Sequence, residues 1–149
     1  MNSDFKELLQ TFNEESVRYL VVGGYAVIHH SQPRYTKDLD VWVEPSAENA
    51  DRIARAFLKF GLPMEGISKH DFATDKFQFY IGVPPCAFDF LTSISGLQFA
   101  RAWSNRTTDD SEGFPIWYLG KADLITAKQA AGRPQDLADL DELRRADSP

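Results

Sequence analysis

Two aspartates, Asp38 and Asp40, have the residue type and spacing needed to bind a divalent metal ion. They open the segment Asp38 to Glu44, in which apolar residues alternate with the two aspartates and Trp42. This period of two predicts a strand, so both carboxylates leave the same face with Cα atoms roughly 6 to 7 Å apart. Such a pair can share a cation, because magnesium prefers oxygen ligands and commonly takes one or two carboxylates together with substrate phosphate.

A third aspartate, Asp89, is the candidate for a further metal ligand or a catalytic base. It lies between Phe88 and Phe90 in the stretch Ala87 to Leu91, which also reads as a strand. Three carboxylates on neighbouring strands would allow two metal ions to be held. The alternative for Asp89 is a charge on an edge strand, where it would discourage aggregation.

Asp-x-Asp is a short pattern that can arise by chance in a chain with 22 acidic residues, and a second copy occurs at Asp139 and Asp141. That pair falls in a predicted helix, where residues two apart diverge by about 200° and cannot bind one ion together. We expect it to belong to a helix surface.

Gly23 and Gly24 lie between a short apolar run, Tyr19 to Val22, and a predicted helix, Tyr25 to His30. The run is typical of a strand that is buried on both faces. At a strand-to-helix turn the backbone amides and the helix dipole can bind a phosphate, and glycine lets a ligand approach the main chain. The glycines could equally serve the turn alone. Asp38 follows Gly24 by 14 residues, a distance that permits the phosphate and metal sites to meet.

Several other side chains near these motifs could take part. Arg34 and Lys37 are candidates for binding phosphate charge, or are solvated charges before a strand. His29 and His30 end the short helix, where a histidine is more often a dipole partner than a catalyst. Trp42 shares the face of the aspartates and could border a nucleobase pocket.

The rest of the chain predicts one α/β (α+β) domain over residues 1–149, a mixed β-sheet flanked by helices. Helices are expected at Asp4 to Ser16, with Ser3 or Asp4 as the cap, and from Pro45 and Ser46 to Phe60, closed by Gly61 and Pro63. Further helices are expected at Gly96 to Trp103, Lys121 to Ala131 and Pro134 to Arg145, the last two (within 121–146) packing on the domain. Further strands are expected at Lys76 to Val83, turned back by Pro84 and Pro85, and at Phe114 to Leu119, an edge strand because Pro115 cannot donate a ladder hydrogen bond. The polar stretch Asn105 to Gly113 is expected to be a loop.

The composition limits the kinds of partner and the cellular compartment that we expect. The chain has 149 residues, 43% of them hydrophobic, which suffices for a core. Its net charge of −6 repels a phosphate backbone and disfavours nucleic acid. The single Cys86 cannot form an internal disulfide, the N-terminal sequence lacks the order of a secretion signal, and no apolar run approaches the ~20 residues of a membrane helix. We therefore expect a cytoplasmic protein with no membrane segment.

Three stretches together resemble the nucleotidyltransferase superfamily with the DNA polymerase β-like fold, whose pattern is Gly-Gly or Gly-Ser, then Asp-x-Asp, then an Asp on a later strand. They are Val21-Val22-Gly23-Gly24, Arg34 to Val41 with its Asp38-Leu39-Asp40, and Phe88-Asp89-Phe90. The sequence looks like the bacterial branch that includes the toxin-type AbiEii-like nucleotidyltransferases. The stretch Lys128 to Leu140 resembles the closing segment of the family, a lysine on one helix followed by Arg, Asp and Asp opening the next.

The resemblance implies transfer of a nucleoside monophosphate (NMP) from a nucleoside triphosphate (NTP) to an acceptor hydroxyl, with Mg²⁺ or Mn²⁺ as cofactor. Asp38 and Asp40 would bind metal, Asp89 would bind metal and help deprotonate the acceptor, and Lys128 would face the nucleotide phosphates. Tyr25 stands where many members keep a serine that holds the terminal phosphate.

The acceptor implied by the resemblance is a protein, an RNA end or a small molecule. Many active relatives carry an additional C-terminal domain that shapes the acceptor site, and little of this chain remains to form one. A protein partner, as in a toxin–antitoxin pair, fits this and the acidic charge better than nucleic acid does. The alternative is a catalytically weak or inactive subunit that keeps the fold and acts through a protein partner.

Overall fold

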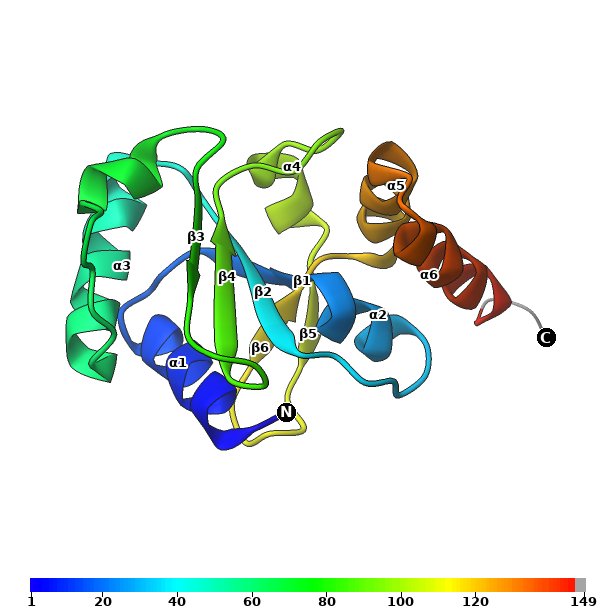
Figure 1. Ribbon diagram of the computed structural model, residues 1–149, viewed down its shortest axis with the longest axis horizontal. Coiled ribbons are helices and arrows are strands. Elements are labelled where there is room, and N and C mark those ends of the chain that lie inside the picture. Colours follow the sequence, from blue (N-terminus) through cyan, green and yellow to red (C-terminus); the bar gives the residue numbers. More distant parts are fainter. Residues whose placement is uncertain (147–149) are drawn as a thin grey trace.

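A mixed six-stranded sheet forms the centre of the protein, and helices lie on both sides of it (Figure 1). The computed structural model describes residues 1–146. The strand order is β3-β4-β2-β1-β6-β5, in which β1 is parallel to β6, β2 is parallel to β4 and the other neighbours are antiparallel. The strands are β1 (Tyr19–Val22), β2 (Asp38–Val43), β3 (Gln78–Ile81), β4 (Ala87–Leu91), β5 (Thr107–Asp109) and β6 (Ile116–Tyr118). The mixed α+β fold expected from the sequence is confirmed.

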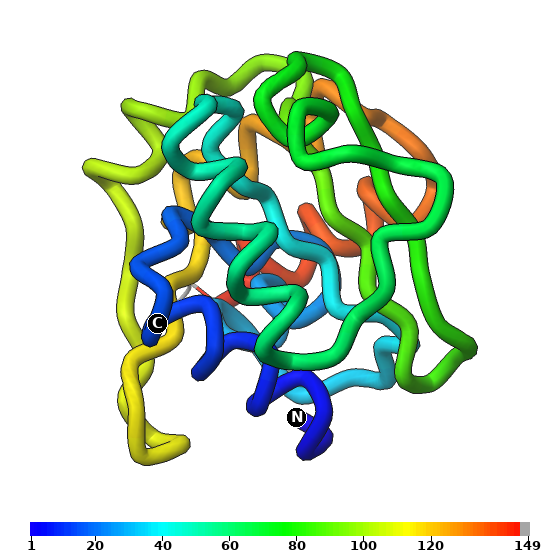
Figure 2. The backbone as a smooth tube through the Cα atoms, turned by 90° about the vertical axis from the view of Figure 1, so that its left-hand side faces the viewer, coloured from blue at the N-terminus to red at the C-terminus, as the bar shows by residue number. Residues whose placement is uncertain are grey.

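The helices divide between the two faces of the sheet. Helices α1 (Ser3–Glu14) and α3 (Ala47–Phe60) cover one face and stand in front of the strands in Figure 2. Figure 1 shows α2 (Gly23–His30), α4 (Phe99–Ser104), α5 (Lys121–Ala131) and α6 (Pro134–Arg145) on the other side, and a short 3-10 helix, η1 (Lys69–Ala73), packs on α3. Within the described residues, none of these helices combines the length and the apolar character needed to cross a bilayer.

Aromatic side chains fix which face of β4 each residue occupies. The ring of Phe90 lies 6.0 Å from that of Phe12 on α1 and 5.0 Å from that of Phe57 on α3, measured between centroids, and all three are buried. Burying one such ring is worth about 1.5–3 kcal/mol. Because successive residues of a strand alternate, Asp89 leaves β4 on the opposite face.

Three interpretations of the strands were wrong. The polar stretch Asn105 to Gly113 is not all loop, because Thr107–Asp109 pairs with β6 as the edge strand β5. Consequently β6 lies between β1 and β5, so Phe114 to Leu119 does not form an edge; Pro115 precedes the paired residues and removes no ladder bond. The edge-strand explanation of Asp89 fails too, since β4 lies between β3 and β2.

The ends of the helices show which local sequence signals set their boundaries. Ser46 caps α3 and Gly61 ends it in the left-handed conformation, as the pattern indicated. For α1 the cap is Asn2, whose side chain accepts a bond from the amide of Phe5, and neither Ser3 nor Asp4 serves. Helix α2 begins at Gly23 rather than at Tyr25, directly at the end of β1.

Candidate active site

Four residues in register form a row across the middle of the sheet. Val22 of β1 pairs with Asp40 of β2, Asp40 pairs with Asp89 of β4, and Asp89 pairs with Tyr80 of β3. Neighbouring strands are about 4.7–4.9 Å apart, and residues that pair directly point to the same face. Asp38 precedes Asp40 by two residues on the same strand. The structure therefore brings the three predicted aspartates together on the face opposite α1 and α3.

Gly23 allows Asp40 to lie against the start of α2. A Cβ on Gly23 would overlap Oδ2 of Asp40, and the φ of +65° at this residue favours glycine in any case. A Cβ on Gly24 would likewise overlap the hydroxyl of Thr36. The space above Gly23 that the sequence suggested for a ligand is thus filled by the Asp40 carboxylate, which lies at the positive end of a helix dipole.

The carboxylates crowd one another electrostatically. Burial, together with the charges of Asp89 and Asp38, raises the pKa of Asp40 to about 7, although Lys128 and Arg133 oppose the rise. Burial and the charge of Asp38 also raise the pKa of Asp89, against the effect of a hydrogen bond from Gln78. Such crowding of half-buried acids is typical of functional sites.

Two side chains of β3 hold the outer carboxylates. The amide nitrogen of Gln78 lies 2.8 and 3.0 Å from the two oxygens of Asp89, and the hydroxyl of Tyr80 donates to Oδ1 of Asp38 at 3.3 Å. Desolvation and the neighbouring carboxylates, Asp38 first, raise the pKa of Tyr80. In this arrangement no group of three or more His, Cys, Asp or Glu side chains among residues 1–146 is close enough together to hold a metal ion.

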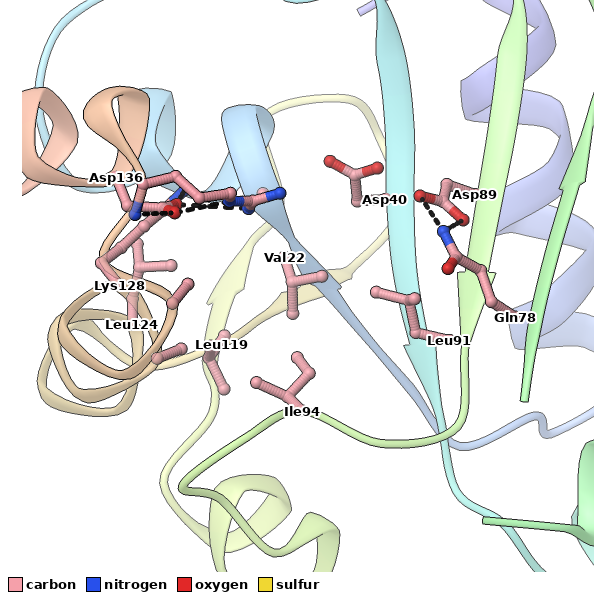
Figure 3. Close-up of a pocket in the computed structure, with 14 residues that line it drawn as sticks. Val22, Asp40, Gln78, Asp89, Leu91, Ile94, Leu119, Leu124, Lys128 and Asp136 are labelled. Carbon is pink, nitrogen blue, oxygen red and sulfur yellow. Dashed lines mark hydrogen bonds and ion pairs between the residues drawn. The ribbon is translucent and has the colours of Figure 1, made fainter. Parts of the chain in front are cut away.

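A cavity of about 360 Å³ opens beside Asp40 and Asp89 (Figure 3). Asp40, Asp89 and Gln78 lie at one end and Lys128 and Asp136 at the other, where Arg133 pairs with Asp136. Between them apolar side chains from five segments of the chain form a wall: Val22, Leu91, Ile94, Leu119 and Leu124. The cavity therefore combines charged ends with a surface that suits a flat apolar ring.

A second cavity, of about 560 Å³, shares Gly23, Asp40, Lys128, Arg133 and Asp136 with the first. Its lining adds Gly24 of α2, the cationic Arg34 and Lys37 from the segment before β2, and the acidic Asp38 of β2. Phosphate groups bind to cations and to amides at helix starts of this kind. The two cavities meet at Asp40.

Buried aspartates of α6 hold the cations of the site in place. Nζ of Lys128 lies 3.2 Å from Asp136 and 3.0 Å from Asp139, and both aspartate side chains are only 2% exposed. Arg133 pairs with Asp136 at 2.7 Å and Arg34 with Asp139 at 3.4 Å. The interpretation of Asp139 as helix surface was wrong, whereas Asp141 is exposed. The i, i+3 spacing of Asp136 and Asp139, which puts both on one helix face, was the signal available in the sequence.

Other predicted residues lie in different places. Lys37 is exposed and lines the second cavity, but Tyr25 lines a separate one and packs edge-on against Phe5 at 5.8 Å. Trp42 is buried against Phe99, away from both cavities around Asp40. His29 and His30 bond to Thr107 and to the Leu119 carbonyl, and burial lowers the pKa of each.

Comparison with known proteins agrees with this geometry. A search of curated proteins finds no match to the sequence. A family model described as "Nucleotidyltransferase of unknown function (DUF6036)" matches residues 2–146, nearly the whole chain, and this span includes both cavities and all three aspartates. The match supports the nucleotidyltransferase superfamily without distinguishing the AbiEii-like branch. This chain belongs to that family of nucleotidyltransferases.

Proposed function

We propose that the protein transfers an NMP group from an NTP to an acceptor hydroxyl and releases pyrophosphate, in a reaction that requires Mg²⁺ or Mn²⁺. The observation that carries the proposal is the register of β2 with β4, which puts Asp40 opposite Asp89 beside the start of α2. Membership of a nucleotidyltransferase family supports the reaction class.

The donor groups are of the type that a hard divalent cation prefers. Asp38, Asp40 and Asp89 supply carboxylate oxygens on one face of the sheet, and the crowding that raises the pKa of Asp40 is the kind that a cation relieves. When bound, the cation would neutralise phosphate charge and stabilise the reacting phosphoryl group. For all three carboxylates to bind it, Gln78 and Tyr80 must release Asp89 and Asp38.

The two cavities suit the two parts of a nucleotide. In our proposal the triphosphate lies in the second cavity, beside the start of α2 and against the cations Arg34, Lys37 and Lys128. The nucleoside lies against the apolar wall of the first cavity. Asp89, which lies nearest the open β3 side of the row, accepts the proton of the incoming hydroxyl.

A protein is the acceptor that we favour. The net charge of −6 works against a polyanionic acceptor, while it does not hinder a protein surface. A role in a toxin–antitoxin pair, as in the AbiEii-like proteins that the sequence resembles, and a cytoplasmic location are part of this proposal.

A second candidate function is a weakly active or inactive subunit that binds a protein partner. The observation that favours it is the contact of Gln78 with both oxygens of Asp89, which occupies the proposed base. The two candidates differ in whether nucleotide is transferred at all.

The test is a transfer assay with matched carboxylate variants. The purified chain, Mg²⁺ and each α-labelled NTP in turn are added to a cell lysate, and both labelled macromolecules and released pyrophosphate are measured. Wild type is compared with the Asp38→Asn, Asp40→Asn double variant and with Asp141→Asn, which changes the exposed aspartate of the other Asp-x-Asp pair.

We expect label and pyrophosphate from wild type and from Asp141→Asn, with a loss of at least about 100-fold in the double variant, as for removal of a principal electrostatic contributor. Nucleotide binding without transfer or pyrophosphate in any preparation would reject the enzyme and favour the binding subunit.

A further inference from the structure

We propose that Tyr80 is an acceptor within the protein itself, so that the chain attaches an NMP group to the hydroxyl of its own Tyr80. This rests on the proposed transferase function and names one hydroxyl on which it acts. The site would be a phenol on an exposed strand edge, next to the carboxylates.

The sheet register places Tyr80 in the row of the reacting groups. Tyr80 is the direct partner of Asp89 across β3 and β4, and Asp89 is the partner of Asp40 across β4 and β2. The side chain of Tyr80 crosses toward β2, because its hydroxyl donates to Oδ1 of Asp38. A phenolic oxygen therefore already lies in contact with one of the carboxylates proposed to hold metal.

Tyr80 is also accessible. It is 48% exposed, and β3 is an edge strand of the sheet, so a nucleotide attached there would have open space on one side. Of the five tyrosines, Tyr19 and Tyr118 are buried and Tyr25 packs against Phe5. Tyr35 is 74% exposed and lines the second cavity, but it lies in the segment between α2 and β2, outside the row.

The step balances with groups that the proposal already contains. The Tyr80 oxygen attacks the α-phosphorus of the NTP, a new oxygen–phosphorus bond forms, and the bond from the α-phosphorus to the oxygen bridging to the β-phosphate breaks. Pyrophosphate leaves with that oxygen. The phenolic proton passes to Asp89, which is the base of the proposed function and the direct partner of Tyr80 across β3 and β4, and from there to solvent. No oxidant or reductant is needed.

The test uses intact mass measurement of the full-length chain. Wild type, Tyr80→Phe, Asp40→Asn and the control Asp141→Asn are each incubated with Mg²⁺ and the four NTPs separately, and modified chains are fragmented to locate the adduct. Pyrophosphate release and labelling of lysate are measured on the same preparations. Thermal unfolding checks that Tyr80→Phe, which removes only an oxygen atom, remains folded.

We expect one NMP group per chain on Tyr80 in wild type and in Asp141→Asn, and none in Tyr80→Phe or Asp40→Asn. An adduct on a different residue overturns the proposal. The proposal also fails if the chain stays unmodified in a preparation that releases pyrophosphate or labels lysate. In that case the proposed transferase function stands. If no preparation modifies itself, releases pyrophosphate or labels lysate, the proposed function fails and this inference fails with it.

Discussion

The Asp40 carboxylate occupies the place beside Gly23 where the Cβ of any other residue would lie. The contact joins the end of β1 to the middle of β2, and it sets the carboxylate at the start of α2. The position of Asp40 therefore depends on a residue that contributes no side chain.

Gly23→Ala tests this contact. A non-glycine residue at φ +65° costs about 1–2 kcal/mol, and displacement of Asp40 adds to that loss. Gly66→Ala is the matched control, because Gly66 has φ +79° and a Cβ added to it would meet no atom within 4 Å. In urea unfolding we expect Gly23→Ala to lose more stability than Gly66→Ala, and only Gly23→Ala to lose transfer activity. Equal losses would show that backbone strain alone matters.

Lys128→Met tests the ion pairs beneath the cavities. Removing one partner of a buried pair typically costs about 3–5 kcal/mol, and the remaining bonds of Arg133 and Arg34 to the two aspartates should bring the loss to the lower end of that range. Lys59→Met, which removes an exposed pair with Glu14, is expected to cost at most about 1 kcal/mol. Denaturant titration measures both. In a background of Asp136→Asn with Asp139→Asn, the cost of Lys128→Met should fall.

Low pH should lower the free energy of unfolding, because it protonates Asp136. Burial favours its neutral form, but hydrogen bonds from Arg133 and Lys128 outweigh this and hold the pKa of Asp136 below its ordinary value. A lowered pKa adds stability above the unfolded-state value of about 3.9, and this stability is lost as pH falls through the folded-state pKa. The stability difference between wild type and Asp136→Asn should therefore shrink as unfolding is measured from neutral pH to about pH 3. For Asp141→Asn the difference should stay small throughout.

Divalent metal should raise the thermal stability of the folded chain. A ligand that binds only the native state stabilises it by about 2.7 kcal/mol at a concentration 100 times its Kd. We expect Mn²⁺ or Mg²⁺ to raise the melting temperature of wild type and of Asp141→Asn, with the shift abolished in Asp38→Asn, Asp40→Asn. Chelator should reverse the shift. An identical shift in the double variant would place the metal elsewhere.

The sequence predicted the elements that carry the aspartates because their local signals agree. Period-two alternation indicated β2, and the phenylalanines around Asp89 indicated β4. The register between these strands could not be predicted, because β2 and β4 are joined through α3 and a long connection rather than by a tight turn. That register is what puts Asp40 opposite Asp89.

The residues that hold the site in place were harder to find. Gln78 and Tyr80 share one face of β3, but only pairing with β4 aims them at carboxylates. Asp139 was interpreted as part of a helix surface because a single helix does not show what covers it, and here Lys128 of α5 does. The strand β5 was missed because short polar edge strands lack a hydrophobic period.

The cations of the site, Arg34, Lys128 and Arg133, are held by ion pairs with Asp136 and Asp139 of α6. This helix lies near the C-terminal end of the described chain. A chain cut before Pro134 would still contain every strand of the sheet, yet Lys128 would have lost both of its anchors. During synthesis on the ribosome, the sheet can therefore assemble before these cations are held in place, and the candidate site is complete only after the last helix has emerged and docked.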